Sequence, residues 1–529
     1  MYFIIPISIV LLLYLYAVCT FRTSTLDDAF ITFRYADNVS QCSGLRWNRG
    51  DLMPTEGMTA MSWVFILAAF HSIFKIDFVI LSKVIGTLAV LFSAWVITRH
   101  IYNHILTTMT SKHALGVSFL AAGTFLMNGE LAYHSISGME TALALCLVSL
   151  FCTLLASLYN TPTKRQAMVT ALAAVVCGLT RPEMNAAIFL SMLTNIAVAH
   201  NRRLNVCYCL APYLISGFVY FTWRWLYFGL PFPLPFYIKQ FAVNSFLPGF
   251  GPTLSFFRSH WPLWPAMIIA VAGLKRLKNW WPNIVFLGTI TFYFLFPCHI
   301  MGGYHRYLSP LLPLMILLLF IGCSQVLGTM KRFQNLLVTI LVSCTVVSVS
   351  RQIFRFNAMN RQIQTDARFF EQGHVTLGKA LRSIDSTGKR LCAVSDAGAI
   401  PFYSNYRVID SYGLNDRDIA LARMKGRNHA SMVLEKCPDL IVLISNFNQS
   451  FQPVIYYEAE IYKEALKDNY SELGCVWGNP EYSLFLLAKT RSFADSVVQG
   501  LLSAYHSSGT IFLDSTFRNR TNNIIMELH

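Results

Sequence analysis

The chain has 529 residues, of which 54% are hydrophobic and 13% are charged, and its mean hydropathy is +0.47. This composition excludes a soluble multidomain protein, a collagen, a disordered chain and a small disulfide scaffold, and it predicts a polytopic α-helical membrane protein. Before residue 350 there are 22 basic and 9 acidic residues, and after it there are 20 and 18. Because the basic excess lies in the apolar half, it is typical of loops between membrane spans and indicates no nucleic-acid partner.

The first apolar run, residues 2–20, is long enough to span a bilayer. It lacks a charged leading segment and a small-residue cleavage pattern, so we interpret it as a transmembrane helix rather than a signal peptide. Ten further runs of spanning length follow it, at about 78–98, 113–128, 139–160, 166–181, 184–200, 206–228, 258–273, 282–298, 307–323 and 333–350. The sequence therefore predicts about 11 transmembrane helices.

Loop charges decide how the apolar run at 58–74 is placed. If this run does not cross the membrane, five loops that together carry 11 basic residues fall on one side, and the opposite loops after residue 77 keep four: Arg181, Lys239, Arg258 and Arg306. The positive-inside rule puts the basic side in the cytoplasm. Residues 58–74 then form an interfacial or re-entrant helix, and the loops 21–58 and 229–257 lie outside the cytoplasm with everything after residue 350.

The tail, residues 351–529, has an ordinary density of charge and alternates short apolar runs with helix-like stretches. This alternation predicts a soluble extracytoplasmic α/β domain after a transmembrane domain of residues 1–350, with residues 505–529 as a polar, frayed tail. Strands are expected at 390–394, 407–409, 440–444 and 483–488, and a helix at 416–425.

Two adjacent acids, Asp27 and Asp28, open the first outer loop. Carboxylates fixed at a helix start just outside a membrane have the chemistry to take a proton from an acceptor hydroxyl, while the second acid orients that hydroxyl or a metal ion. Arg34 follows Asp27 by two helical turns and so projects from the same face. The alternative is structural, because Thr25 and Asp28 fit a helix capping box and the helix dipole favours acids in a first turn.

The segment 27–36 (DDAFITFRYA), followed by 45–48 (LRWN) and 55–63 (TEGMTAMSW), resembles the first outer loop of the GT-C membrane glycosyltransferases, especially their arabinofuranosyltransferase-like branch. Later segments resemble the same branch in the same order: 137–141 (SGMET), 179–183 (LTRPE), 227–239 (YFGLPFPLPFYIK), 396–403 (DAGAIPFY) and 408–416 (VIDSYGLND). The resemblance covers most of residues 20–420.

This resemblance implies a GT-C fold, a polyprenyl-phosphate-linked sugar as donor, and a hydroxyl of an envelope glycan or protein as acceptor. By position, Asp27 is the leading candidate for the catalytic base and Asp28 for its partner. The pattern predicts neither a protein metal site nor a certain cofactor, and a divalent cation is an open alternative. The residues expected to contact the substrates are Arg34, Tyr35, Glu56, His134, Glu140, Arg181 and Tyr237.

Cationic groups are expected near the outer interface, because charge grows on the departing lipid phosphate as the glycosidic bond breaks. The chain has no acidic residue between positions 184 and 365. Backbone amides of Gly302 and Gly303 can approach a phosphate, although the family often has an acid next, where this chain has Tyr304. The structural alternative for Arg306 and Tyr307 is that they anchor the start of a helix at the membrane interface. The alternative for Lys239 is that its long side chain only extends its charge out of the membrane. The predicted donor-phosphate-binding residues are Lys239, His305, Arg306 and Tyr307.

Several of these residues also fit purely structural roles. Arg181 and Glu183 flank a proline between two apolar runs, which suits an internal ion pair at a helix kink as well as substrate contact. His134 fits a satisfied interface histidine. Asp396 and Asp410 each follow an expected strand, where ligands often bind, and turn capping explains them equally well.

Together these patterns predict an inverting glycosyltransferase of the bacterial cytoplasmic membrane whose site faces outward. Its expected partners are the lipid-linked donor, the acceptor and the surrounding membrane lipids. Arabinofuranose is the favoured sugar on resemblance alone, and mannose and glucose stay open. The alternatives are a polytopic transporter and a polysaccharide-assembly protein without transferase activity. A transporter predicts inverted repeats with matched discontinuous helices, and the sequence shows neither.

Overall fold

The computed structural model of the protein describes residues 4–107, 110–159, 162–239, 248–296, 303–447, 450–479, 482–505 and 511–513. The chain forms two compact units. The first comprises Met1–Ser24, Thr59–Leu226 and Ala242–Ile363, and the second comprises Thr25–Met58, Tyr227–Phe241 and Gln364–His529. The first outer loop expected from the sequence therefore belongs to the same unit as the tail.

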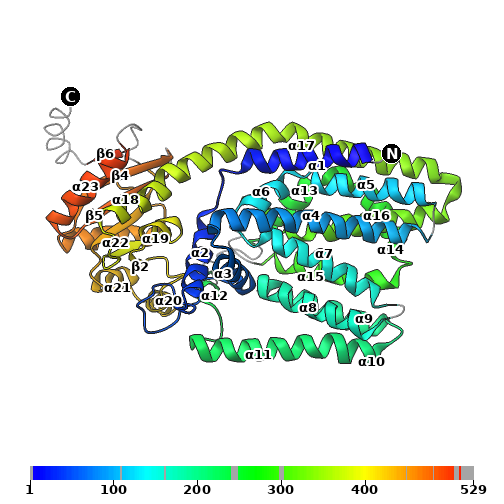
Figure 1. Ribbon diagram of the computed structural model, residues 1–529, viewed down its shortest axis with the longest axis horizontal. Coiled ribbons are helices and arrows are strands. Elements are labelled where there is room, and N and C mark those ends of the chain that lie inside the picture. The colour runs from blue at the N-terminus through cyan, green and yellow to red at the C-terminus, as the bar shows by residue number, and fades with distance from the viewer. Residues whose placement is uncertain are drawn as a thin grey trace. The chain divides into compact units, whose positions relative to one another are not determined.

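The first unit is built from helices (Figure 1). They are α1 (Ile4–Phe21), α3 (Met61–Phe74), α4 (Phe78–Ile105), α5 (Ser111–Leu126), α6 (Gly129–Ile136), α7 (Thr141–Ser157), α8 (Lys164–Thr180), α9 (Asn185–Val198), α10 (Arg202–Asn205), α11 (Ala211–Phe228), α13 (Phe250–Ser259), α14 (Trp264–Leu274), α15 (Trp281–Tyr293), α16 (Leu312–Thr329) and the first part of α17 (Gln334–Phe370). Single helical turns join some of them: η1 (Pro182–Met184), η2 (Val206–Leu210), η3 (Trp261–Leu263), η4 (Lys278–Trp280), η5 (Ser309–Leu311) and η6 (Lys331–Phe333). Each apolar run that was predicted to span overlaps one of these helices.

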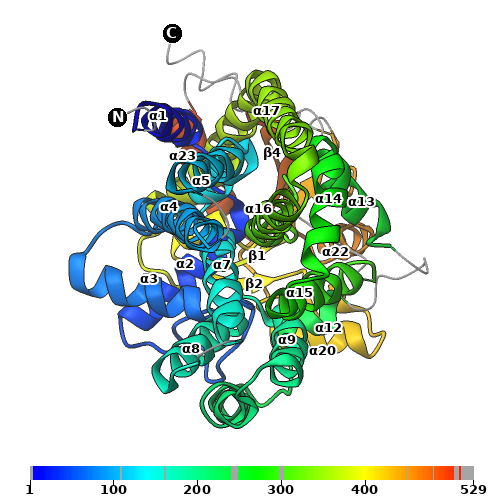
Figure 2. The ribbon, with the colours of Figure 1, turned by 90° about the vertical axis from the view of Figure 1, so that its right-hand side faces the viewer.

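Helix α16 is the central helix of this unit. It is apolar on all its faces, which is typical of a helix surrounded by other helices. In its apolar window 89% of the residues are buried, against 17% in the window of Arg202–Phe228. Figure 2 shows α4, α5, α7 and α14 around α16, and each of them contacts it. The approach of α14 is close, since a Cβ at Gly273 would lie 2.0 Å from the carbonyl oxygen of Gly322. Glycines at such crossings let two membrane helices pack backbone to backbone.

Four helical segments among the described residues are long and apolar enough to cross a membrane, or up to five if the bent pair α5–α6 is one span. They are Phe78–Ile105, Arg202–Phe228, Ser309–Thr329 and Gln334–Ile384. Other helices, such as α9 with 14 residues and α15 with 13 residues, fall short of the roughly 20 residues that a span needs. The polytopic helical architecture is thus confirmed, and the count of eleven spans stays a prediction.

Two shorter segments shape the first unit near the expected outer surface. Helix α3 has 14 residues and coincides with the run at 58–74, whose interfacial or re-entrant placement stays a prediction. Helices α5 and α6 are bent by 60° at their junction. Asn128 begins α6, where its side chain accepts a hydrogen bond of 3.0 Å from the N–H of Glu130.

The second unit contains a six-stranded mixed sheet with strand order β2-β1-β3-β5-β4-β6 (Figure 1). Strand β1 pairs in parallel with β2 and β3, and the pairs β3–β5, β5–β4 and β4–β6 are antiparallel. The expected α/β domain and its four expected strands are therefore confirmed. The strands are β1 (Leu391–Val394), β2 (Arg407–Asp410), β3 (Leu440–Ser445), β4 (Ser471–Asn479), β5 (Tyr482–Ala488) and β6 (Ile511–Leu513).

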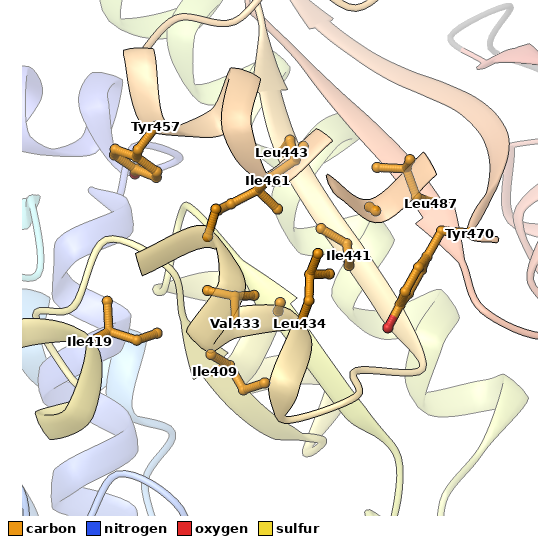
Figure 3. Close-up of a cluster of buried hydrophobic side chains, with 13 residues drawn as sticks. Ile409, Ile419, Val433, Leu434, Ile441, Leu443, Tyr457, Ile461, Tyr470 and Leu487 are labelled. Carbon is orange, nitrogen blue, oxygen red and sulfur yellow. The ribbon is translucent and has the colours of Figure 1, made fainter. Parts of the chain in front are cut away.

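Helices cover this sheet and supply its core. Figure 3 shows side chains from β3 (Ile441, Leu443), α21 (Val433) and α22 (Ile461) gathered in one buried cluster. Ile441 and Leu443 are two residues apart in a strand, so both reach the same face of the sheet. The helices of the second unit are α2 (Asp27–Ser40), α12 (Leu234–Lys239), the end of α17, the π-helical turn η7 (Glu371–Val375), α18 (Thr376–Ile384), α19 (Ala399–Ser404), α20 (Arg417–Met424), α21 (His429–Glu435), α22 (Tyr456–Lys467) and α23 (Arg491–Tyr505).

Candidate active site

The acid pair stands at the start of helix α2, as expected from the sequence. The residue at the N-cap is Leu26, whose side chain has no polar group, so the structural alternative of a capping box formed by Thr25 and Asp28 is wrong. The helix begins one residue later than a cap at Thr25 requires. Asp28 is exposed and Asp27 is partly buried, so the two carboxyl groups have different surroundings.

Asp27 is held by the start of α19. Its Oδ1 accepts a hydrogen bond of 2.8 Å from the backbone N–H of Ala399. Gly398 lies so close that a Cβ there would be 2.2 Å from the carbonyl oxygen of Asp27 and 2.3 Å from its carboxyl carbon. Glycine is therefore required at this position. The rings of Phe30 and Phe402, with centroids 5.5 Å apart, pack α2 against α19.

The charges around Asp27 adjust its affinity for a proton. Burial raises the pKa of Asp27 to about 7, the charge of His374 opposes this rise, and the charges of Asp396 and Asp28 add to it. His374 Nε2 lies 2.7 Å from Asp396 Oδ2, and the hydroxyl of Tyr482 donates to the same oxygen. A carboxyl group with a pKa near neutrality can exchange a proton at the working pH, as a general base must.

Arg34 joins the first loop to α19 and to the segment that follows it. Its guanidinium donates hydrogen bonds to the carbonyl oxygens of Trp47 at 2.9 Å, Tyr406 at 2.8 Å and Pro401, and to Asn48 Oδ1 at 3.0 Å. Its guanidinium carbon also lies 4.7 Å from the ring centroid of Trp47. These contacts give Arg34 a structural role, and its contact with substrate stays a prediction.

Three other expected substrate residues of this unit also make contacts within it. The hydroxyl of Tyr35, a fully buried side chain, accepts a hydrogen bond of 3.0 Å from the N–H of Gly57. Glu56 is buried as well. Tyr237 is half-buried, and its hydroxyl accepts a hydrogen bond of 3.2 Å from the N–H of Phe232. Their contact with substrate stays a prediction.

Asp410 at the end of β2 caps a turn. Its carboxylate accepts hydrogen bonds of 2.8–3.0 Å from the backbone N–H groups of Tyr412, Gly413 and Asn415, and one of 2.9 Å from the side chain of Asn415. Burial raises the pKa of Asp410 to about 6, and these hydrogen bonds oppose the rise. The turn-capping alternative is therefore confirmed for this residue.

In the first unit, two buried arginines share one carboxylate. Glu140 Oε1 lies 3.0 Å from Arg181 Nη2 and 3.6 Å from Arg306 Nη2, and Arg181 Nη1 lies 3.2 Å from Glu183 Oε1. The guanidinium carbons of Arg181 and Arg306 are 4.8 and 5.3 Å from the ring centroid of Tyr307. The internal ion pair weighed from the sequence is thus present, and it extends to a cluster of two cations and two carboxylates.

A second polar group of the first unit surrounds His305. Its Nδ1 lies 3.1 Å from Glu130 Oε2, and its Nε2 lies 3.1 Å from Ser255 Oγ. His134 is buried, and its Nε2 is 2.8 Å from the carbonyl oxygen of Tyr304. Tyr304 and His305 both have left-handed backbone angles, with φ of 56° and 54°. Such angles are uncommon for side chains of this size, so the surrounding contacts must hold this turn in place.

Two of the expected phosphate ligands cannot be placed. Lys239 ends α12, but its side chain lies outside the described residues, as does Gly302. Within the part of the chain that the structure describes, no group of three or more His, Cys, Asp or Glu side chains is arranged to hold a metal ion.

Three residues of these clusters were missed in the sequence. Glu130 had a usable signal, because an acid between apolar runs is a functional candidate by default. His374 and Tyr482 had none, since they lie far along the chain from Asp27 and belong to no spacing pattern. The fold alone brings them together.

Comparison with known proteins places the fold. Residues 361–485 match a family described as "Domain of unknown function (DUF8728)". No curated protein matches the sequence. The crystal structure of ArnT from Cupriavidus metallidurans in the apo state resembles this chain with a TM-score of 0.60 and 11% identity, over 92% of this chain and 98% of that chain. The structure of ArnT from the same organism bound to undecaprenyl phosphate gives a TM-score of 0.57 and 10% identity over the same shares.

At this level of identity the likeness concerns the fold. The chain has the fold of the GT-C glycosyltransferases, as the sequence resemblance predicted. The arabinofuranosyltransferase-like branch is a finer assignment and stays a prediction.

Proposed function

We propose that this protein is a membrane glycosyltransferase that moves a sugar from a polyprenyl-phosphate donor to a hydroxyl acceptor. The observation that carries the proposal is the pair Asp27 and Asp28 at the start of α2, one carboxyl group partly buried and the other exposed, in a chain with the GT-C fold. ArnT, a protein of the same fold, was crystallised with undecaprenyl phosphate. That complex supports a lipid phosphate as the carrier of the sugar.

The reaction is a single displacement at the anomeric carbon. The acceptor oxygen bonds to that carbon, the bond from carbon to phosphate oxygen breaks, and the phosphate keeps the electron pair. The acceptor proton passes to Asp27, whose pKa of about 7 suits a base at neutral pH. Asp28 orients the acceptor hydroxyl. Attack opposite to the leaving phosphate inverts the anomeric configuration.

The departing phosphate needs positively charged partners, because its charge increases in the transition state. We assign this role to Arg306, His305, Tyr307 and Lys239. Arg306 lies in the cluster of buried charged side chains around Glu140, 3.6 Å from its Oε1. Its planar guanidinium matches the geometry of a phosphate group.

The charge pattern of the loops supports a site on the outer face of a bacterial cytoplasmic membrane. Arabinofuranose is the sugar favoured by the resemblance of the first loop, and mannose and glucose are the alternatives. The acceptor is a hydroxyl of an envelope glycan or of a pilin-like protein.

Turnover of the purified full-length protein tests this function. The protein in lipid nanodiscs is mixed with synthetic polyprenyl-phosphate arabinofuranose, mannose or glucose and an extract of envelope glycans, and release of free polyprenyl phosphate is measured. We expect release with one of these sugars. If every donor stays intact while the protein moves lipid-linked sugar across vesicle membranes, the protein is a transporter.

A further inference from the structure

Beside Asp27 the second unit has a polar cluster that the displacement itself does not use. It consists of His374, Asp396 and Tyr482, which come from the turn η7, the end of β1 and the start of β5. His374 Nε2 lies 2.7 Å from Asp396 Oδ2, to which the Tyr482 hydroxyl also donates. The imidazole stacks on the ring of Phe370, with centroids 5.2 Å apart. Side chains from two other segments, His374 and Tyr482, thus converge on the carboxyl group of Asp396.

The turn that carries His374 is unusual. Residues Glu371–Val375 form a π-helical turn between α17 and α18. Such turns insert one extra residue into a helix and occur frequently at functional sites. The wider turn leaves His374 buried against Asp396, while Glu371 of the same turn is exposed and pairs with Lys379 at 3.2 Å.

We propose that His374, held by Asp396, is a positioning residue that keeps Asp27 ionised and ready to accept the acceptor's proton, an inference that rests on the proposed function. Asp27 packs against Gly398 and accepts a hydrogen bond from Ala399, two and three residues after Asp396. Phe30 of the same helix contacts Phe370, the ring on which His374 stacks. The negative charges of Asp28 and Asp396 oppose the ionisation of Asp27. A protonated His374 is the cation that offsets them. Glu458 of α22 and Tyr482 also interact with Asp396.

The charges of this cluster balance through the reaction. Before transfer, ionised Asp27 and Asp396 with protonated His374 sum to one negative charge. When Asp27 takes the proton from the acceptor hydroxyl, the three groups become neutral together. Without His374, Asp27 would lose the positive charge that lowers its pKa, while Asp396 and Asp28 would still raise it, so its affinity for a proton would increase. A larger share of the base would then be protonated before the acceptor arrives.

The pH dependence of transfer tests this role. In His374→Gln, which keeps a hydrogen-bond donor but loses the charge, we expect the midpoint of the acidic limb of kcat/KM to rise by on the order of one pH unit. In His374→Lys, which keeps a cation, the midpoint should stay at or below that of the wild type. Glu371→Gln is the matched control, because it removes an exposed charge from the same turn, and its midpoint should not move. A uniform loss of rate in His374→Gln with an unmoved midpoint would overturn the inference.

A second measurement separates this inference from the proposed function. Infrared difference titration follows the carboxyl band of Asp27, identified by its loss in Asp27→Asn, and needs no substrate. We expect His374→Gln to raise the midpoint of this band and Glu371→Gln to leave it unchanged. A raised midpoint in a protein that transfers no sugar would refute the proposed function alone. An unmoved midpoint in an active enzyme would refute the role of His374 alone.

Discussion

The carboxylate of Asp27 accepts a hydrogen bond of 2.8 Å from the backbone N–H of Ala399, 372 residues further along the chain. The candidate base is therefore held by the C-terminal part of the chain, although it stands in the first outer loop. Both residues belong to the second unit. This relationship gives the α/β domain a direct part in the proposed chemistry.

A methyl group at Gly398 should disturb this arrangement. In Gly398→Ala the new Cβ would lie 2.2 Å from the carbonyl oxygen of Asp27, so α2 or α19 must shift. We expect a loss of roughly 1–3 kcal/mol in unfolding free energy, measured by thermal unfolding, and a larger proportional loss of transfer. Gly50→Ala is the control, because a Cβ there meets open space among the described residues. Equal effects of both substitutions would contradict the assigned contact.

Removing the shared carboxylate of the arginine cluster should destabilise the first unit. Glu140→Gln leaves two buried guanidinium groups with one acid between them, and breaking a buried ion pair costs roughly 3 kcal/mol. Thermal unfolding of the purified protein measures this loss. Glu183→Gln is the comparison, since that side chain is more exposed and pairs only with Arg181 among the ion pairs of the described residues. A smaller loss for Glu140→Gln than for Glu183→Gln would count against the cluster.

Buried acids of the second unit should make its stability fall as pH rises. Burial raises the pKa of Glu458 to about 7, although hydrogen bonds from Ser395 and two backbone N–H groups oppose the rise. A carboxyl group whose pKa is raised on folding contributes most stability at low pH and loses it as the pH rises through the folded value. Between pH 5 and pH 8 we expect Glu458 to account for a loss on the order of 2 kcal/mol.

Melting temperatures at pH 5 and pH 8 check this slope. The difference between the two should shrink in Glu458→Gln, whose amide resembles the protonated acid. Glu460→Gln, which changes an exposed acid on the same helix, should keep the wild-type difference. An unchanged slope in Glu458→Gln would show that this acid is ionised at little cost in the folded protein.

Cysteine labelling tests the orientation of the chain. Cys42 lies in the first outer loop and is exposed, and Cys207, also exposed, follows a loop that the positive-inside rule places in the cytoplasm. With a membrane-impermeant maleimide on intact spheroplasts, we expect Cys42 to react and Cys207 to react only after permeabilisation. Cys42→Ser identifies the signal. The reverse pattern would invert the topology.

Local signals in the sequence were sufficient to predict most helices and strands. They were insufficient to predict which residues contact one another in the fold. The runs at 390–394 and 440–444 are apolar and short, so they identified β1 and β3 directly. Strand β4 was missed, because Gly474 and Gly478 interrupt its apolar pattern. The capping box weighed for Thr25 and Asp28 does not form, because α2 begins at Asp27 and its N-cap is therefore Leu26.

The site shows the same division. The position of Asp27 and Asp28 at a helix start follows from local sequence, and so does the possibility of an ion pair between Arg181 and Glu183. The partners of Asp27 do not, because contacts with Ala399 and His374 depend on the tertiary fold. Gly398 is visible in the DAGAIPFY segment. The structure alone shows why a glycine is needed there, because Asp27 packs directly against it.

The most direct test of the central claim is the rate of sugar transfer from a saturating polyprenyl-phosphate donor by Asp27→Asn and Asp28→Asn. Loss of a general base typically costs 10²- to 10⁴-fold. We expect Asp27→Asn to lose activity by about this factor while remaining folded, and Asp28→Asn to lose less. Transfer at the wild-type rate by both variants would contradict the assignment of this acid pair to the reaction.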